Sequence, residues 1–321
     1  MADGRDQLPY IDADEVTRLT PWPALIDAIR QAFREGGISP ERHHHTIPGS
    51  DRDDITLLLM PAWNPAGSFG VKLASISPSN AAIGKPTLHG VYVLFAKDTG
   101  VPMAVLDAGS LTARRTAAAS ALASQCLSRA ASSTLLIIGT GRVARQLIAA
   151  HCSVRPITEV RIWGRDAQHA EEAIEAIRDQ VDADCRAVSS IEEGAAGADI
   201  VSSAIPTEKP LLRGHYLGPG THVDLVGAYT PAMCEADPEL IAMAGQVFID
   251  TMEGALSEAG DLLQAAEMGV FDFDDIAGDM YRMASSESSL RRDTDEITVF
   301  KSVGAALEDL AAAELCRRGR A

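Results

Sequence analysis

The sequence lacks any arrangement of cysteines that would build a disulfide framework or a zinc site. The cysteines are odd in number, and none pairs with another as Cys-x-x-Cys. They are Cys126, Cys152, Cys185, Cys234 and Cys316. Such spacing is typical of free thiols in a reducing compartment. The first ten residues are polar and acidic, without the basic and apolar regions of a signal peptide, so we expect a cytoplasmic protein.

The sequence also lacks net positive charge and a long uninterrupted apolar segment. Its 28 basic and 45 acidic residues give a formal net charge of −17, which disfavours nucleic acid and anionic membranes as partners. The most apolar stretch, 116–141, contains Gln125, Arg129 and many small residues. It therefore predicts a buried helix followed by a strand rather than a membrane span. In so acidic a chain, clustered Arg and Lys residues would indicate a pocket for an anionic substrate.

A length of 321 residues suits two domains, and the hydrophobic pattern changes at about residue 111. Before it, apolar residues recur at helical spacing over 19–35, after the start signal Thr20-Pro21. Short apolar runs separated by turn residues then predict antiparallel strands at 56–60, 69–76, 90–95 and 102–106. The first part of the chain is therefore expected to be α+β.

From about residue 111, expected strands alternate with helices. A small-residue helix over 112–129 leads into the apolar run 134–138, which suits a strand buried on both faces. Further strands are expected at 159–163, 185–188, 199–204, 222–226 and 247–250, with helices that include 143–152 and 167–180. This alternation predicts an α/β fold with a Rossmann-type, doubly wound parallel sheet. A last helix over 302–317 is expected to return to the first domain, so that 1–112 and 302–321 form one domain and 113–301 the other.

A glycine-rich turn directly follows the expected strand 134–138 and opens the next helix. It reads Gly139-Thr140-Gly141-Arg142-Val143-Ala144, a GxGxxA pattern. The strand before it, the helix after it and a second strand that ends about 20 residues later indicate a dinucleotide site rather than an ordinary turn. The glycines permit a tight turn and close approach of the pyrophosphate, and the helix N-terminus supplies N–H groups. The ends of two later strands add Ala204 and Gly227 to the expected cofactor-binding residues.

The end of the second strand of this domain bears on the choice between NAD and NADP. NAD sites usually carry an acidic residue there, whereas an arginine accommodates a 2′-phosphate. Here the strand ends Trp163-Gly164-Arg165-Asp166. We therefore predict a preference for NADP(H), with Arg165 on the 2′-phosphate and Arg142 assisting, while NAD(H) stays possible. Asp166 is interpreted as the N-cap of the following helix.

Three stretches of the first domain carry basic residues in unusual settings. Arg42 precedes the strands, Lys72 lies inside an apolar strand, and Arg114-Arg115 stand at the start of a small-residue helix. Taken singly, each is more commonly structural, because a lysine in a strand usually faces solvent and an arginine at a helix start is usually a surface charge.

Together with several further motifs, these residues resemble the ornithine cyclodeaminase/mu-crystallin family over almost the whole chain. The motifs are Leu58–Trp63, Gly70–Lys72, Pro86-Thr87, Leu111–Ala118, Gly139–Gly141, Asp250–Asp261 and Ile297–Gly304. The resemblance implies a discontinuous N-terminal domain that binds substrate and forms a homodimer, beside the Rossmann domain. It also implies that Arg42, Lys72, Arg115 and Val303 face the substrate and that Thr87 and Ser302 contact the cofactor. Arg115 would anchor a carboxylate and Lys72 would exchange a proton with the substrate nitrogen.

One run departs from the pattern of true cyclodeaminases, which carry a Gly-Gly-Asp…Lys-x-Glu stretch after the fifth strand. Tyr229 stands in the place of that Asp and Met233 in the place of that Lys. A tyrosine, with an ordinary pKa near 10, does not serve as that carboxylate. Ornithine cyclodeamination is therefore disfavoured.

A carboxylate anchor, a lysine and a nicotinamide suit the reduction of a cyclic imine acid. The resemblance to ketimine reductases favours conversion of Δ1-pyrroline-2-carboxylate to L-proline, a step of proline metabolism, or of Δ1-piperideine-2-carboxylate to L-pipecolate. Alternatives are an amino-acid dehydrogenase similar to alanine dehydrogenase, an ornithine cyclodeaminase, and a non-enzymatic, crystallin-like NADPH-binding protein. His89 is a candidate second proton donor, with a structural strand residue as the more common alternative. No metal site is expected, because the adjacent His43, His44 and His45 do not all converge on one ion.

Overall fold

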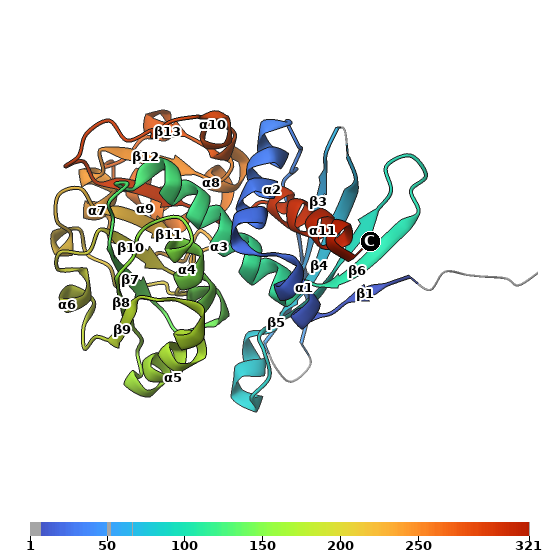
Figure 1. Cartoon of the computed structure of the whole chain (residues 1–321), viewed down its shortest axis with the longest axis horizontal. Helices are drawn as coiled ribbons and strands as arrows, with labels where there is room; N and C mark the ends of the chain where they lie inside the picture. The colour runs from blue at the N-terminus through green and yellow to red at the C-terminus, as the bar shows by residue number, and fades with distance from the viewer. Residues whose placement is uncertain (1–7, 50–52, 66, 321) are drawn as a thin grey trace, which may run out of the picture. The chain divides into compact units, whose positions relative to one another are not determined.

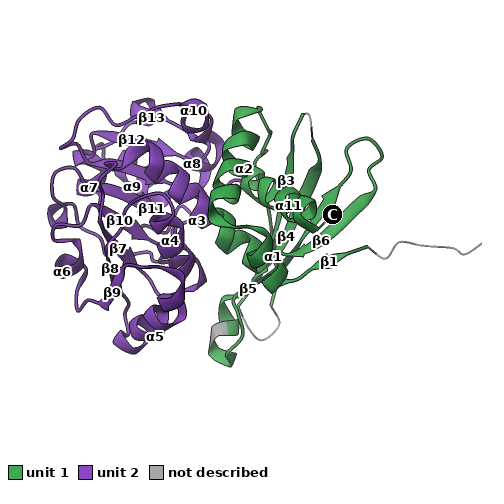
Figure 2. Ribbon diagram, in the orientation of Figure 1, with its two compact units in different colours: residues 1–115, 306–321 green, residues 116–305 purple. Residues whose placement is uncertain are grey.

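The computed structural model describes residues 8–49, 53–65 and 67–320, which form two compact units (Figures 1 and 2). Unit 1 comprises 1–115 and 306–321, and unit 2 comprises 116–305. Residues 1–7, on which most of the argument about a signal peptide depends, lie outside the described residues. Across the described ranges, no helix is both long and apolar enough to span a membrane.

Unit 1 is built on a six-stranded sheet with the strand order β1-β6-β5-β4-β3-β2. Neighbouring strands are antiparallel, except that β1 and β6 pair in parallel. The strands are β1 (Tyr10–Ile11), β2 (His43–Ile47), β3 (Ile55–Trp63), β4 (Phe69–Ile76), β5 (Leu88–Phe95) and β6 (Pro102–Asp107). The helices are α1 (Ala13–Leu19), α2 (Trp22–Arg34), the 3-10 helix η1 (Pro78–Ile83), the first part of α3 (Ala108–Leu127) and α11 (Ala306–Arg320).

The two faces of this sheet differ in their covering. Helix α11 packs against β3, β4 and β5 and beside α2, and α1 contacts β6 (Figure 1). Alternate strand residues on the covered face, such as Met60, Tyr92 and Leu94, are buried. Leu73 and Val93 belong to the opposite face and are only partly buried. The period-two alternation therefore leaves a row of apolar side chains on the face away from the helices.

Unit 2 is built on an eight-stranded parallel sheet with the order β13-β12-β14-β11-β10-β7-β8-β9. The strands are β7 (Thr134–Ile138), β8 (Glu159–Trp163), β9 (Asp184–Ala187), β10 (Ile200–Ser203), β11 (His222–Leu225), β12 (Gln246–Ile249), β13 (Ile276–Gly278) and β14 (Thr298–Lys301). Besides the rest of α3, the helices are α4 (Arg142–Cys152), α5 (Ala167–Ile177), α6 (Ile191–Ala195), α7 (Pro238–Met243), α8 (Met252–Glu258), α9 (Gly260–Glu267) and α10 (Met280–Ser285), with the 3-10 helices η2 (Arg178–Gln180), η3 (Gly214–Tyr216) and η4 (Phe273–Asp275). The predicted α/β class with a doubly wound parallel sheet is confirmed.

The strand order of unit 2 reverses between β7 and β10. The chain runs from β7 outward through β8 to β9 and then returns to place β10 on the other side of β7. In open parallel sheets, ligands bind outside the carboxyl ends of the strands at such a reversal. The glycine-rich turn follows β7 and therefore lies at this point.

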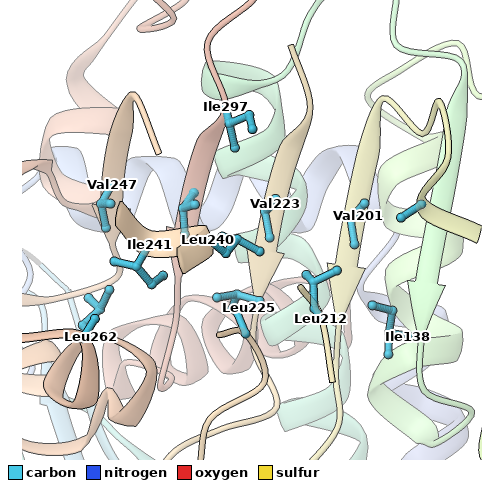
Figure 3. Close-up of a cluster of buried hydrophobic side chains, with 14 of the residues drawn as sticks. Ile138, Val201, Leu212, Val223, Leu225, Leu240, Ile241, Val247, Leu262 and Ile297 are labelled. Atoms are coloured by element: carbon cyan, nitrogen blue, oxygen red, sulfur yellow. The ribbon is translucent and has the colours of Figure 1, made fainter. Parts of the chain in front are cut away.

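Apolar side chains bury one face of this sheet beneath α6, α7 and α9. Figure 3 shows Val201, Val223 and Leu225 of the strands with Leu240 of α7 and Leu262 of α9. All five are buried. The alternate strand residues point to the opposite face of the sheet.

The sequence pattern missed β14, a central strand between β11 and β12. Its four residues are all buried, and so short a run carries little periodicity. The prediction that the last helix begins at residue 302 is also wrong, since α11 begins at Ala306. Gly304, with φ of 90°, has a backbone conformation that does not belong to a right-handed helix.

Candidate functional site

Lys72 is buried in the middle of β4. It lies opposite Met60 of β3 and Tyr92 of β5, on the face of the sheet that α11 covers. The residue is only 3% exposed. The usual solvent-facing position of a strand lysine therefore does not apply here, because strand alternation directs the side chain beneath the helix.

Two carboxylates of α11 pair with the basic side chains of unit 1. Lys72 Nζ lies 2.8 Å from Asp309 Oδ2, and Arg115 Nε lies 3.1 Å from Asp309 Oδ1. Arg115 Nη1 lies 2.7 Å from Glu308 Oε2. Lys72 also donates a hydrogen bond to Thr112 Oγ1 at 3.2 Å. Asp309 thus bridges the lysine and the arginine, and the sequence analysis named neither Asp309 nor Glu308.

Burial lowers the pKa of Lys72 to about 8. The carboxylate of Asp309 opposes this shift, whereas the positive charges of Arg115 and Arg42 lower the pKa further. A lysine with this pKa is mostly protonated at neutral pH and yet releases its proton readily. Arg42, half-buried before β2, thus belongs to the same electrostatic environment.

Arg114 and His89 lie elsewhere. The guanidinium of Arg114 donates to the hydroxyl and carbonyl oxygens of Thr20 and stacks on the ring of Trp22, so it holds α3 to the junction of α1 and α2. His89 of β5 lies opposite Ser75 of β4, and Ser75 is three positions along β4 from Lys72. An odd separation places His89 on the opposite face of the sheet, where it is exposed. His89 is therefore not a second proton donor beside Lys72 within one chain.

The glycine-rich turn has the geometry of an anion cradle. Gly141 is the N-cap of α4 and offers no side chain to cap the helix. A Cβ at this position would meet open space, so an anion has room beside the first N–H groups of the helix. Gly139 has φ of 124°, and a Cβ there would lie 3.1 Å from the carbonyl oxygen of Ala204. These residues fit the pyrophosphate of a dinucleotide.

The other residues predicted to contact the cofactor lie mostly along the same edge of the sheet. Arg165 follows β8, Ala204 follows β10, Gly227 lies two residues beyond β11, and Ser302 follows β14. Because all these strands are parallel, their carboxyl ends share one edge. Thr140 and Val143 are half-buried in the turn and Arg142 is exposed. The structure therefore brings the residues predicted in unit 2 together.

The end of β8 carries no acidic side chain at the positions where NAD sites hold one. Trp163 accepts a backbone hydrogen bond from Gly139, and a Cβ at Gly164 would lie 2.6 Å from Thr140 Cγ2. Arg165 is exposed and has no hydrogen bond or ion pair within the described part of the chain. Asp166 caps α5 by accepting from the backbone N–H of Gln168, as interpreted from the sequence.

A buried cluster of charged residues holds the loops after β10 and β11. Glu235 accepts from Ser203 Oγ at 2.6 Å and from the backbone N–H groups of Ile205, Gly227 and Ala228 at 3.1, 2.6 and 3.0 Å. Desolvation raises the pKa of Glu235 to about 7.

Lys301 Nζ lies 2.8 Å from Asp261 Oδ2 and 3.8 Å from Glu235 Oε2, and it donates to the carbonyl oxygen of Ala228 at 2.7 Å. These contacts fix the backbone around Ala204 and Gly227, and the sequence analysis assigned no role to Glu235, Asp261 or Lys301.

Asp250 holds the loop after β14. Its Oδ2 accepts from Ser302 Oγ at 3.0 Å and from the backbone N–H groups of Val303 and Gly304 at 2.7 and 2.6 Å. Val303 is 7% exposed, and a Cβ at Gly254 would lie 2.7 Å from its Cγ2. Asp250 therefore sets the conformation of the two loop residues predicted to face cofactor and substrate.

Two remaining predictions concern Thr87 and metals. Thr87 is exposed just before β5, and its carbonyl oxygen accepts from the backbone of Ser77. The described residues contain no group of three or more His, Cys, Asp or Glu side chains arranged to hold a metal ion. In β2, His43 and His45 project from one face and His44 from the other, as strand alternation requires.

Several known proteins are similar to this chain in sequence and in structure. A Δ1-pyrroline-2-carboxylate reductase of Paracoccus denitrificans is 35% identical over 317 residues, covering 96% of each chain. The structure of Δ1-pyrroline-2-carboxylate reductase of Thermococcus litoralis, in complex with NADH and L-proline, superposes with a TM-score of 0.90 at 27% identity, covering 97% of each chain. An archaeal alanine dehydrogenase dimer with bound NAD superposes with a TM-score of 0.87 at 26% identity, over 97% of this chain and 95% of the other. The ornithine cyclodeaminase/mu-crystallin family model matches residues 11–319, and the chain belongs to this family.

Proposed function

We propose that this protein is an NAD(P)H-dependent reductase of a cyclic imine carboxylate, with Δ1-pyrroline-2-carboxylate as substrate and L-proline as product. The observation that carries the proposal is the buried ammonium of Lys72, with its pKa near 8, beside Arg115. The names of the Paracoccus and Thermococcus relatives support the same substrate class. Δ1-Piperideine-2-carboxylate, which would give L-pipecolate, belongs to that class as well.

The residues of unit 1 supply binding and proton transfer. Arg115 and Arg42 would hold the carboxylate, and Lys72 would keep the imine nitrogen protonated, because an iminium accepts hydride at C2 more readily than an imine. Val303 would also face the substrate, as the resemblance to the family implies. The nicotinamide, when bound, supplies the hydride; one hydride and one proton convert the C=N bond into an amine.

Assays with several substrates separate this reaction from its alternatives. We expect oxidation of NADPH with Δ1-pyrroline-2-carboxylate and a loss of about 10²- to 10⁴-fold in kcat for Lys72→Met, with little change in cofactor affinity. An absence of turnover with both five- and six-membered imines would refute the proposal. Faster, ammonia-dependent reduction of pyruvate would favour an amino-acid dehydrogenase, release of ammonia from ornithine a cyclodeaminase, and cofactor binding without turnover a crystallin-like role.

We further propose that the cofactor is NADPH in preference to NADH. Arg165 at the end of β8 is the supporting feature, together with the exposed Arg142 at the start of α4. Arg165→Ser should lower kcat/KM for NADPH by about 10- to 100-fold and leave that for NADH nearly unchanged, because a charged hydrogen bond to the 2′-phosphate is lost. Arg178→Ser, at an exposed arginine paired with Glu175, is the matched control. A wild-type kcat/KM higher with NADH than with NADPH would contradict the preference.

We also propose a homodimer formed through the uncovered face of the unit 1 sheet, with the substrate-binding role assigned to the same unit. The apolar side chains of Leu73 and Val93 support this assembly, as does the dimeric state of the archaeal alanine dehydrogenase. Val93→Arg should shift the sedimentation equilibrium toward monomer. Leu256→Arg, at a residue 52% exposed in unit 2, should not. A monomeric wild-type protein would overturn the assignment.

A further inference from the structure

We propose that Asp309 is a positioning residue that keeps Lys72 in its proton-donating form and links it to Arg115. The inference rests on the proposed role of Lys72 as the proton donor of the reductase. Asp309 touches neither substrate nor cofactor in this scheme; it acts through the two side chains that do.

The geometry shows one carboxylate with two separate partners. Asp309 Oδ2 faces Lys72 Nζ at 2.8 Å, while Oδ1 faces Arg115 Nε at 3.1 Å. Asp309 itself is fully buried on α11. A carboxylate that lies between two cations fixes the separation of their side chains, so the proton donor and the carboxylate anchor keep a constant relation to each other.

Among the groups around Lys72, Asp309 is the one that favours the protonated form of the lysine. From α3, Arg115 disfavours a second positive charge, as does Arg42 from the segment before β2. From β5, the neighbouring side chain is the buried Tyr92, whose pKa is raised well above its ordinary value by desolvation first and then by the charges of Asp309 and Glu314. Burial and both arginines lower the pKa of Lys72, and Asp309 raises it.

Glu308 provides a matched control within the same helix turn. It is equally buried and carries the same charge, and it pairs with Arg115 at 2.7 Å, whereas the carboxylate that pairs with Lys72 is that of Asp309. Removing the charge of Glu308 should therefore weaken the anchor without changing the proton affinity of Lys72. Removing the charge of Asp309 should change both.

The first test is the pH profile of kcat/KM for Δ1-pyrroline-2-carboxylate with Asp309→Asn and Glu308→Gln. For the wild type, kcat/KM should fall as pH rises through about 8, because Lys72 loses its proton. Asp309→Asn should move this alkaline limb about one pH unit lower, a loss of about fivefold at pH 8 that nearly disappears at pH 6. Glu308→Gln should raise KM and leave the limb in place. A uniform loss at every pH for Asp309→Asn, or an equal shift for Glu308→Gln, would overturn the inference.

A second test does not depend on turnover. The lysines of this chain are Lys72, Lys85, Lys97, Lys209 and Lys301, few enough for NMR titration of ¹⁵N-labelled side chains, with Lys72→Met assigning the signal. The Lys72 amine should titrate near pH 8 in the wild type and lower in Asp309→Asn. An unchanged titration refutes the role of Asp309, whereas a shifted titration in a protein that reduces no imine refutes only the proposed function. If Asp309→Asn does not fold, Asp309→Glu compared with Glu308→Asp serves instead: only the former should displace the titration of Lys72.

Discussion

Lys72 in unit 1 and Lys301 in unit 2 are both buried and both lie 2.8 Å from an aspartate, yet their pKa values shift in opposite directions. Desolvation disfavours the charged form of both lysines. For Lys301 the carboxylates of Asp261, Glu235 and Asp250 outweigh it and raise the pKa. For Lys72 the single carboxylate of Asp309 is outweighed by desolvation and by the positive charges of Arg115 and Arg42, and the pKa falls to about 8. The sign of the shift follows the balance of neighbouring charges rather than burial alone.

The two clusters also differ in the partners of their carboxylates. Asp261 Oδ1 accepts from the backbone N–H groups of Glu235 and Ala236, and Glu235 accepts from three further backbone groups. The carboxylate of Asp309, by contrast, pairs with the side chains of Lys72 and Arg115. Backbone partners fix the fold of loops, whereas side-chain partners leave a cation able to exchange a proton or turn toward a ligand. We therefore propose a structural role for the cluster of unit 2 and a chemical role for that of unit 1.

Substitution of the two lysines should give the largest contrast in stability. Lys301→Met removes the ammonium between Glu235 and Asp261 and leaves two buried carboxylates, so the free energy of unfolding should fall by about 3–5 kcal/mol. Lys72→Met should cost clearly less, because Asp309 retains Arg115 as a partner. Urea denaturation of both variants at pH 7 gives the measurement, and equal losses would contradict the distinction between the clusters.

The free energy of unfolding should also depend on pH differently for the two lysines, with a somewhat smaller effect than the substitutions at pH 7. Between the folded pKa of Lys72, about 8, and its ordinary value of 10.5, the unfolded chain binds a proton that the folded chain has lost. The contribution of Lys72 to the free energy of unfolding therefore rises with pH across this window, by up to about 3 kcal/mol. For Lys301, whose folded pKa is raised, the contribution is retained below 10.5 and lost only as pH rises through the higher folded pKa.

The free energy of unfolding is measured for the wild type and for Lys72→Met from pH 7.5 to 10.5. The difference isolates the contribution of Lys72, since the other titrating groups are common to both proteins. The rise should disappear in Lys72→Met and persist in Lys301→Met, if the latter is folded in that range. A rise that persists in Lys72→Met would contradict the lowered pKa of Lys72.

Removal of one neutral hydroxyl from each cluster should give the smallest effects. Thr112→Val deletes a hydrogen-bond acceptor of Lys72, and Ser203→Ala deletes a donor to Glu235. Each should cost about 1 kcal/mol. Thr112→Val should move the alkaline limb of kcat/KM slightly to lower pH, because the ammonium loses a partner. Ser203→Ala should lower only the free energy of unfolding, and a displaced pH profile in that variant would weaken the assignment of a structural role.

Several local features could be predicted from the sequence. The bounds expected for β7 and β8 are those observed, because β7 is a continuous apolar run and β8 alternates polar and apolar residues before Gly164. The glycine-rich run from Gly139 to Ala144 leads from β7 into the first turn of α4, as expected. Asp166 caps α5, since capping depends on the side chain and the backbone only two residues away.

The pairing of the charged residues could not be predicted in this way. Arg115 and Asp309 lie 194 positions apart, and Asp309 reads in the sequence as an acidic residue in the first turn of a helix. His89, proposed from the general acid–base chemistry of histidine, lies on the face of the sheet opposite Lys72, since the face depends on the register of β4 and β5. Helix α11 began four residues later than expected because its loop is held by Asp250.

The sequence by itself determined the α/β class, the glycine-rich turn after β7 and the family, because these depend on local pattern and motif order. It also supplied Lys72, Arg42 and Arg115 as candidates. Only the tertiary structure decided that Lys72 is buried beneath α11 and that Asp309 joins it to Arg115. Proton affinity in a protein depends on desolvation and on charges a few ångströms away, and both exist only after distant parts of the chain have packed together.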